Sequence, residues 1–163
     1  MKTSAAPILD IALIKDRVDA ARGKGMSIVL ANGCFDLFHA GHLRYLEGAA
    51  RLGDLLVVGI NSDRQTRILK GTGRPFTSEN ERAEIVAAIR FVDSVTIFDE
   101  PTVEGLIRSL RPDIHAKGTD YTVDTVPERE IVQSYGGRVA IVGDPKDHSS
   151  TEIIERIGAE FGN

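Results

Sequence analysis

The chain has 163 residues, of which 42% are hydrophobic, 27% charged and 6% aromatic, and its formal net charge is −4. This size and composition indicate one globular domain, 1–163, with a leading helix in 1–25 and a catalytic core in 26–163. The acidic balance argues against nucleic acid as a partner, and the lack of about 20 consecutive apolar residues argues against a membrane span or membrane partner. No apolar core followed by a small-residue cleavage site is found near the N-terminus, so we expect a cytoplasmic protein.

Apolar patterns divide the chain into alternating helices and strands. A leading amphipathic helix is predicted over 8–24, with a glycine-rich stop at its end. Apolar runs predict strands over 27–31, 54–60, 95–98, 113–116 and 138–142. Helical spacing and capping signals predict helices over 41–52, from about 62, over 78–90, over 102–110, for about eight residues from 127, and from 149 onward. The alternation implies an α/β, Rossmann-like three-layer fold: a five-stranded parallel sheet with helices on both faces.

The segment 32–42, Asn-Gly-Cys-Phe-Asp-Leu-Phe-His-Ala-Gly-His, joins the first predicted strand to a helix start. Free backbone N–H groups and the helix dipole make such a start a site for phosphate, and it carries His39 and His42. The same pair could be half of a metal site or two structural histidines. Zinc would need a further ligand, and His115 and His148 lie in other loops. We expect contact with phosphate, and no metal ligand among the side chains.

Several common sites are excluded by the sequence. Cys34 is the single cysteine, so an intramolecular disulfide and a multi-cysteine metal site are ruled out. We expect it to be a small buried residue at a strand end. Neither G-x-x-x-x-G-K-[ST] nor G-x-G-x-x-G occurs, which excludes P-loop and dinucleotide-binding enzymes by motif.

Further candidates lie in the predicted loops. Ser149 and Glu152 fit a capping box, so capping of the last helix is sufficient to explain the Ser-Ser-Thr cluster at 149–151. Its place after the fifth strand, on the same rim as the histidines, also allows a second helix start that faces phosphate. A local positive field would come from lysines and arginines in these loops, Lys70, Arg74, Lys117 and Lys146.

The second predicted strand ends at the edge where open α/β sheets bind ligands. Asn61 and Asp63 follow it there, and both are candidates for substrate binding.

Gly33-x-Phe35-Asp36-x-x-His39-x-Gly41-His42, together with the Ser-Ser-Thr cluster, resembles the nucleotidyltransferase superfamily of cytidylyltransferases and small adenylyltransferases. Within it the chain is most similar to the D-glycero-β-D-manno-heptose 1-phosphate adenylyltransferases, which are free-standing or form the second half of a bifunctional kinase. This similarity spans about 28–157 and includes Leu-Lys-Gly at 69–71, Arg-Pro at 74–75 and Lys117-Gly118-x-Asp120-Tyr121.

Departures from related branches favour this one. Phosphopantetheine-type and nicotinamide-type members usually have an arginine where this chain has Ile154, and glycerol-3-phosphate cytidylyltransferases have one at Asp144. The cluster Ser-Ser-Thr stands where the heptose branch commonly has Ser-Thr-Thr, and His148 replaces a residue that is often small, so its role is open.

The resemblance implies transfer of AMP from ATP to a sugar 1-phosphate, with Mg²⁺ held mainly by phosphates. The product would be an ADP-sugar, ADP-heptose being favoured, for lipopolysaccharide or another cell-surface carbohydrate. Catalytic roles are implied for His39, His42 and Lys70. Nucleotide binding is implied for Gly33, Cys34, Phe35, His39, Gly41, His42, Lys117, Gly118, Asp120, Ser149, Ser150 and Thr151. Substrate binding is implied for Asp36, Lys70, Arg74 and Tyr121.

The implied partners are a small sugar phosphate, a separate sugar kinase coupled in function, and further copies of the chain in a homodimer or higher homo-oligomer, for which the leading helix offers a surface. Two other functions stay open. One is a cytidylyltransferase for a polyol or amino-alcohol phosphate, because the sequence does not fix the base. The other is a nucleotide-binding module without catalysis.

Overall fold

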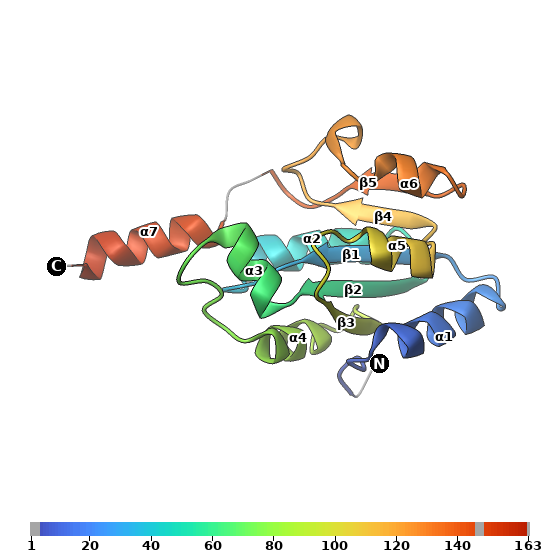
Figure 1. The fold of residues 1–163 in the computed structure, drawn as a ribbon, viewed down its shortest axis with the longest axis horizontal. Helices are drawn as coiled ribbons and strands as arrows, with labels where there is room; N and C mark the ends of the chain where they lie inside the picture. The colour runs from blue at the N-terminus through green and yellow to red at the C-terminus, as the bar shows by residue number, and fades with distance from the viewer. Residues whose placement is uncertain (1–3, 146–148, 163) are drawn as a thin grey trace.

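The computed structural model describes residues 4–145 and 149–162. Its elements in chain order are α1 (Ile11–Arg22), β1 (Ile28–Gly33), α2 (Ala40–Ala50), β2 (Leu55–Asn61), α3 (Asp63–Lys70), α4 (Glu79–Ala87), β3 (Ser94–Phe98), α5 (Glu104–Leu110), β4 (Ile114–Lys117), the 3₁₀ turn η1 (Val123–Thr125), α6 (Arg129–Gln133), β5 (Arg138–Ile141) and α7 (Ser150–Phe161). Within the described residues, five strands form one parallel sheet in the order β3-β2-β1-β4-β5 (Figure 1). The predicted α/β fold with a five-stranded parallel sheet is therefore confirmed.

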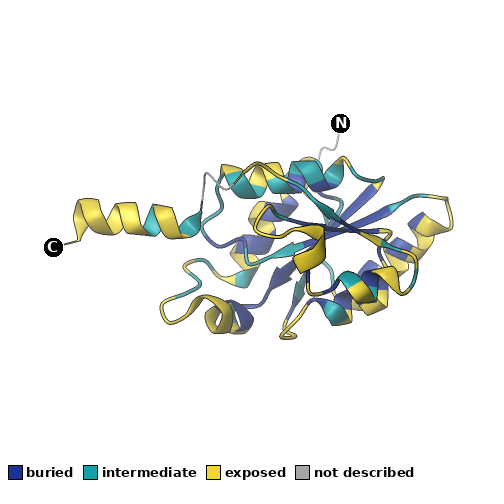
Figure 2. Ribbon diagram, turned by 90° about the horizontal axis from the view of Figure 1, so that it is seen from above, coloured by how far each residue is buried: buried dark blue, intermediate teal, exposed yellow. Residues whose placement is uncertain are grey.

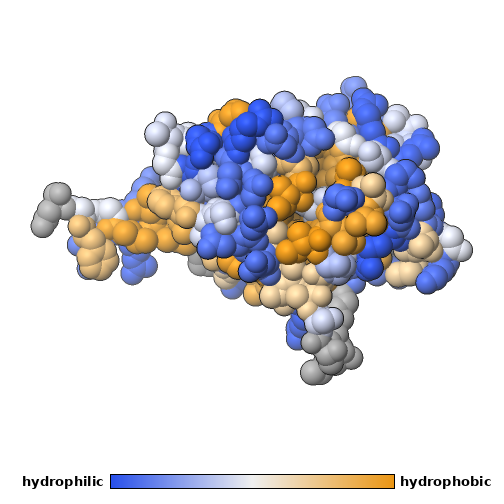
Figure 3. All heavy atoms as spheres, turned by 60° about the horizontal axis from the view of Figure 1, so that its bottom comes forward, coloured by the Kyte–Doolittle hydropathy of each residue, from blue (hydrophilic) through white to orange (hydrophobic). Residues whose placement is uncertain are grey.

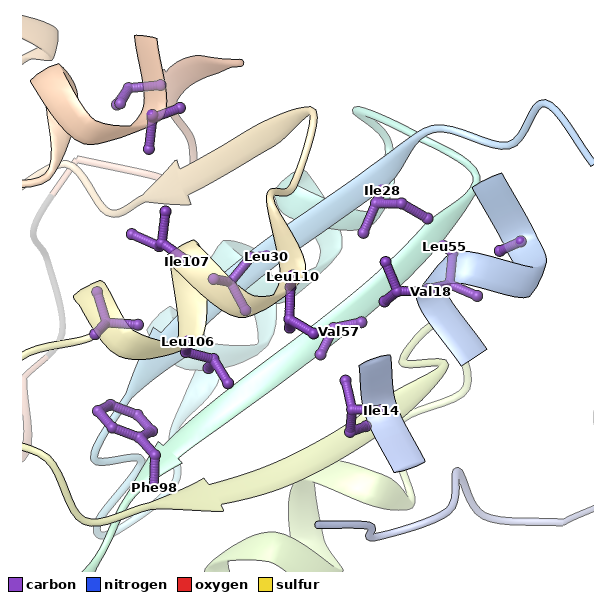
Figure 4. Close-up of a cluster of buried hydrophobic side chains, with 14 of the residues drawn as sticks. Ile14, Val18, Ile28, Leu30, Leu55, Val57, Phe98, Leu106, Ile107 and Leu110 are labelled. Carbon is purple, nitrogen blue, oxygen red and sulfur yellow. The ribbon is translucent and has the colours of Figure 1, made fainter. Parts of the chain in front are cut away.

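Helices cover both faces of the sheet because successive side chains of a strand point to opposite sides. On β1, Ile28 and Leu30 join a buried cluster with α1, α5 and α6, whereas Val29 and Ala31 join a second cluster with α2 and α4. Figure 4 shows side chains of α1 and α5 meeting over β1 and β2 in the first cluster. The central strands are mostly buried, β5 at the edge of the sheet is only partly buried, and the outer sides of the helices are exposed (Figure 2). In the described part of the chain, no helix has the length and apolar character needed to cross a bilayer.

The leading helix begins later than predicted. Residues 7–9 are extended because their backbone pairs with β3: Val95 N–H donates to Pro7 O (3.0 Å), and Leu9 N–H donates to Val95 O (2.9 Å). Asp10 then caps α1 by accepting a hydrogen bond from Leu13 N–H (2.9 Å). The helical spacing that suggested a start at residue 8 thus includes residues that belong to the edge of the sheet.

The segment between β4 and β5 also differs from the prediction. The turn η1 was not predicted, and α6 has five residues and starts two residues after Pro127. Glu128 occupies the N-cap of α6 without capping it through its side chain. Its carboxylate instead lies near Lys117. The carboxylate thus lies against another element instead of capping α6.

The last helix, α7, extends away from the sheet (Figure 1). Its predicted capping box is confirmed: Glu152 N–H donates to Ser149 Oγ (3.1 Å), and Ser149 N–H donates to the Glu152 carboxylate (3.1 Å). None of its described residues is buried, and Phe161 is 80% exposed. Apolar atoms cover part of its surface (Figure 3). The start of α7 contacts the turn after β1, since Ser150 Oγ donates a hydrogen bond to Asp36 O (2.7 Å).

Candidate active site

A cavity of about 480 Å³ lies at the carboxyl ends of the strands. β1 and β4 are neighbours there although they are distant in sequence, and ligands of open α/β sheets bind at such switch points. The cavity is lined by the ends of these strands, the start of α2, the end of α3 and the start of α7. Residues predicted for the site that line it are Gly33, Cys34, Phe35, Asp36, His39, Gly41, His42, Asn61, Lys70, Arg74, Lys117, Gly118, Asp120, Tyr121, Ser149, Ser150 and Thr151.

The two histidines form the cap of α2. His39 Nδ1 accepts from Gly41 N–H (3.1 Å), and His42 Nδ1 accepts from His39 N–H (3.4 Å). Their rings stack with centroids 3.9 Å apart. Because Nδ1 accepts in both rings, the N–H group of each ring lies at Nε2. The pair therefore has a structural role in the cap and also lines the cavity, so these two readings of the motif are compatible.

His42 is neutral near pH 7. Burial, followed by the nearby His39 and Lys70, lowers the pKa of His42 from 6.5 to about 4, although Asp36 acts in the opposite direction. His42 can therefore donate a hydrogen bond from Nε2–H but brings no positive charge. Positive charge at this end of the cavity comes from Lys70 and Arg74, which also line it.

The turn after β1 has an unusual backbone. Phe35 and Leu37 have φ values of 52° and 51°, a left-handed conformation that is costly for residues other than glycine. Arg82 of α4, which is 0% exposed, holds this turn. Its guanidinium donates to Cys34 O, to Thr77 O (3.2 Å) and to Asp63 Oδ1 (2.8 Å).

Asp36 fixes the loop that follows α3. Its buried carboxylate accepts from Arg74 Nε (2.6 Å), from Phe76 N–H (3.0 Å) and from Thr77 N–H and Oγ1 (3.2 and 3.1 Å). Burial acts to raise the pKa of Asp36, but the hydrogen bonds from Phe76, Arg74 and Thr77 hold it below its ordinary value. Asp36 is thus an anion that positions Arg74 at the cavity.

Lys117 is the last residue of β4, where the sequence suggested a loop, and it is 8% exposed. Its ammonium lies 4.6 Å from the ring centroid of Tyr121 and 3.8 Å from Glu128 Oε2. Burial lowers the pKa of Lys117, against the opposing effect of Glu128. The lysine therefore presents a largely desolvated cation to the cavity.

Two expectations for single residues are corrected. Asp63 does not line the cavity, because its carboxylate pairs with Arg82 and its N–H donates to Glu79 Oε2 (2.6 Å). Cys34 is only partly buried and lines the cavity, with Sγ 3.8 Å from Asn61 Oδ1. The predictions for Lys146 and His148 lie outside the described residues.

Sequence reasoning missed five residues in or next to the site. Arg44 and Asp144 line the cavity and form an ion pair (2.8 Å). Tyr45 lines it as well and donates from its hydroxyl to Ala116 O (2.8 Å), which joins α2 to β4. Arg82 and Glu128 act from outside it. Arg44 and Tyr45 follow the histidine motif by two and three residues, a signal in the sequence, whereas Arg82 and Glu128 leave no local signal.

Comparison with known proteins decides the family. A model of the cytidylyltransferase-like family matches residues 30–156. The chain belongs to this family. The matched range starts within β1 and ends in α7, so it includes the histidine motif, Lys117 and the Ser-Ser-Thr cluster of this cytidylyltransferase-like chain. The predicted relation to nucleotidyltransferases is confirmed.

Relatives of this cytidylyltransferase-like chain include proteins named "Bifunctional protein HldE". The chain is 52% identical to that of Syntrophotalea carbinolica over 144 residues, and 46% identical to that of Geobacter sulfurreducens over 157 residues. These matches cover 88% and 96% of this chain but 29% and 32% of the relatives, so the chain spans about a third of their length.

A solved structure is also similar. The crystal structure of the lipopolysaccharide core biosynthesis protein from Thermoplasma volcanium GSS1 matches with a TM-score of 0.66 and 27% identity, over 75% of this chain and 100% of that one.

Proposed function

We propose that this cytidylyltransferase-like domain transfers AMP from ATP to a sugar 1-phosphate, with heptose 1-phosphate as the favoured acceptor, and releases pyrophosphate. The observation that carries the proposal is that one cavity is lined by the histidine pair, Lys70, Arg74, Lys117 and the start of α7. Such a set suits two phosphate compounds that must react with each other. The resemblance to heptose 1-phosphate adenylyltransferases and the similarity to proteins named HldE support the choice of acceptor.

The chemistry requires positioning rather than a protein base. A phosphate monoester has a second pKa of about 6, so its oxygen is already an anion near neutral pH and can attack the α-phosphate directly. The P–O bond to the β-phosphate breaks, and pyrophosphate leaves with the electron pair. The protein must hold two mutually repelling anions in line and stabilise the charge that develops on the leaving oxygen.

Each part of the cavity has a role in this proposal. His42 and His39 donate from Nε2–H to the triphosphate, and Ser150 and Thr151 bind its β- and γ-phosphates at the start of α7. Lys70 and Arg74 draw the reacting phosphates together. Gly33, Cys34, Phe35 and Gly41 lie along the nucleotide, with Ser149 capping α7. Lys117, Gly118, Asp120, Tyr121 and Asn61 surround the nucleotide or the sugar.

Mg²⁺ fits this proposal only as a companion of the phosphates. In the described residues, no group of three or more His, Cys, Asp or Glu side chains could hold a metal ion. Asp36 is engaged by the loop at 74–77, and Asp144 is paired with Arg44. A bound Mg²⁺ would neutralise phosphate charge, and the phosphate oxygens would supply most of its ligands.

The remaining parts of the proposal concern partners. We propose coupling to a sugar kinase that supplies the sugar 1-phosphate; in relatives named bifunctional, the coupled activity would lie in the same polypeptide. We also propose self-association, supported by exposed apolar side chains on α1 and α7 such as Leu13 and Ile157. Light scattering of the purified chain tests whether it self-associates. We place the reaction in the cytoplasm, where ATP is supplied.

The decisive experiment measures pyrophosphate release with four nucleoside triphosphates and a set of sugar 1-phosphates and polyol phosphates. We expect release with ATP and heptose 1-phosphate. Release with CTP and a polyol or amino-alcohol phosphate would favour a cytidylyltransferase instead. Binding of ATP without release for any acceptor would favour a module that binds nucleotide without catalysis.

A further inference from the structure

A carboxylate outside the cavity lies against one of the cations that line it. Glu128, at the N-cap of α6, is 8% exposed, and its Oε2 atom is 3.8 Å from Lys117 Nζ. The same oxygen is 3.6 Å from His115 Nε2. That separation exceeds hydrogen-bonding distance, so His115 is a close neighbour rather than a partner.

We propose that Glu128 is the positioning residue for Lys117, holding its ammonium group at the cavity wall, over the ring of Tyr121, for an anionic group of the bound nucleotide or sugar phosphate. The inference rests on the proposed function for the identity of that anion. It goes beyond that function by assigning a role to a residue that neither lines the cavity nor follows from the family's motif.

The geometry leaves Lys117 between two negative groups when a ligand is bound. Glu128 lies on the inner side, and the cavity lies on the other. Burying a lone ammonium group is costly, and a lysine in such a place tends to lose its proton unless an anion is near. Glu128 is an anion within ion-pair distance of Lys117, and it opposes the lowering of the lysine pKa that burial causes.

The other groups around Lys117 do not replace this charge. His115, on the same strand, has its pKa lowered by burial, against an opposing effect of Glu128, and is therefore neutral. Tyr121 offers its ring face, and Tyr45 of α2, whose pKa is raised by burial, stays a neutral phenol. On β5, the residue opposite Lys117 is Ile141, which is apolar.

Glu128 is itself adapted to an ionised state. Burial acts to raise the pKa of Glu128, but its charged surroundings, with the Lys117 ammonium group close by, hold that pKa below its ordinary value. Its side chain does not cap α6 and lies instead against Lys117 of β4. This arrangement is expected if the carboxylate serves the lysine.

The test compares the full 163-residue chain with the variants K117R, E128Q, E128D and K117R/E128Q. Glu130, which is exposed two residues further on, supplies the matched control E130Q. The first measurement is an NMR titration of the lysine side chains, in which the Lys117 signal is assigned by its loss in K117R. The second is the Kd of ATP between pH 6.5 and 9.5.

We expect E128Q to lower the pKa of Lys117 by about one unit or more relative to wild type and E130Q, the size of effect typical of losing a nearby opposite charge. The affinity of E128Q for ATP should then fall about tenfold from its plateau as the pH rises one unit above that new pKa. K117R/E128Q should lose this alkaline decline because an arginine stays charged. E128D should lie between wild type and E128Q, which keeps the test decisive if E128Q folds poorly.

An unchanged Lys117 pKa in E128Q and E128D would overturn the inference. Tighter binding of ATP by E128Q near pH 7 would also overturn it, because that result is expected if the carboxylate merely repels phosphate. A purely structural role would lower the melting temperature without moving the Lys117 titration, which also overturns it. The NMR titration needs no nucleotide. A failure of wild type to bind ATP would therefore refute the proposed function separately.

Discussion

The buried guanidinium of Arg82 offers a stringent test of how the strained turn after β1 is held. The substitution Arg82→Lys keeps the charge but removes the planar fork that reaches three acceptors, Cys34 O, Thr77 O and the Asp63 carboxylate. A lysine ammonium group can reach one of them from the same position. Two acceptors then lose their donor inside the protein.

The magnitude follows from these contacts. A buried polar group that loses its partner costs about 1 to 3 kcal/mol, and Asp63, which is partly open to water, lies at the low end. We therefore expect Arg82→Lys to lower the free energy of unfolding by about 2 to 4 kcal/mol. For a chain of this size that loss corresponds to a fall of about 5 to 15 °C in Tm.

Urea denaturation followed by circular dichroism measures the loss, and Arg64→Lys is the matched control. Arg64 also binds a carboxylate, that of Asp99 at 2.7 Å, but both side chains are more than half exposed. Its replacement should cost less than about 1 kcal/mol. If both variants lose the same stability, or if Arg82→Lys loses less than about 1 kcal/mol, the reasoning about the buried fork is wrong.

Four further predictions concern other parts of the molecule. His42 takes up a proton below about pH 6.5 in the unfolded chain but only near pH 4 in the folded chain, so the free energy of unfolding should fall by about 2 to 3 kcal/mol as the pH drops across this range. Urea midpoints measured across this range should therefore depend more steeply on pH for wild type than for His42→Gln. An equal pH dependence of the two proteins would contradict the prediction. His42→Ala should also lower pyrophosphate release by about 100-fold or more with an unchanged circular dichroism spectrum, and near-normal turnover would exclude the proposed role. Gly59→Ala would place a Cβ atom 2.7 Å from Leu106 Cδ2 and should cost about 1 to 3 kcal/mol in thermal melts, whereas Gly158→Ala meets open space on an exposed helix and should be neutral or stabilising by up to about 1 kcal/mol. Asp36→Asn should raise the KM for the sugar phosphate more than that for ATP, because it loosens the loop at 74–77; equal changes in both would argue against this division of roles.

Local signals in the sequence predicted much of the fold. The predicted capping box of Ser149 with Glu152 forms, and the helix predicted to start at residue 78 begins with another, of Ser78 with Glu81. Such caps can be predicted because they depend on residues three positions apart. The continuous apolar run at 54–60 becomes β2, whose seven residues are all buried, as expected for the middle of a parallel sheet.

Contacts between distant residues explain what could not be predicted. Asp36 lines the cavity as predicted, and its role in substrate binding stays a prediction. Its carboxylate also binds a loop about 40 residues away, a contact that no spacing in the sequence reveals. Lys117 was expected in a loop, but hydrogen bonding to β5 extends β4 by this residue. Arg82 and Glu128 act on the site from other elements. Most residues that line the cavity could be predicted from the sequence, whereas the groups that orient them could not.

In α7, the residues that line the cavity are distinct from the exposed residues that make up the rest of the helix. Its first turn holds Ser150 against Asp36 and lines the cavity, while neither buried cluster of the described residues includes a side chain from this helix. The sheet and its covering helices can therefore fold to full stability whether or not the outer turns of α7 keep their present residues. Changes there should leave unfolding transitions untouched, and under the proposed function they would alter only how firmly the terminal phosphates of the nucleotide are held.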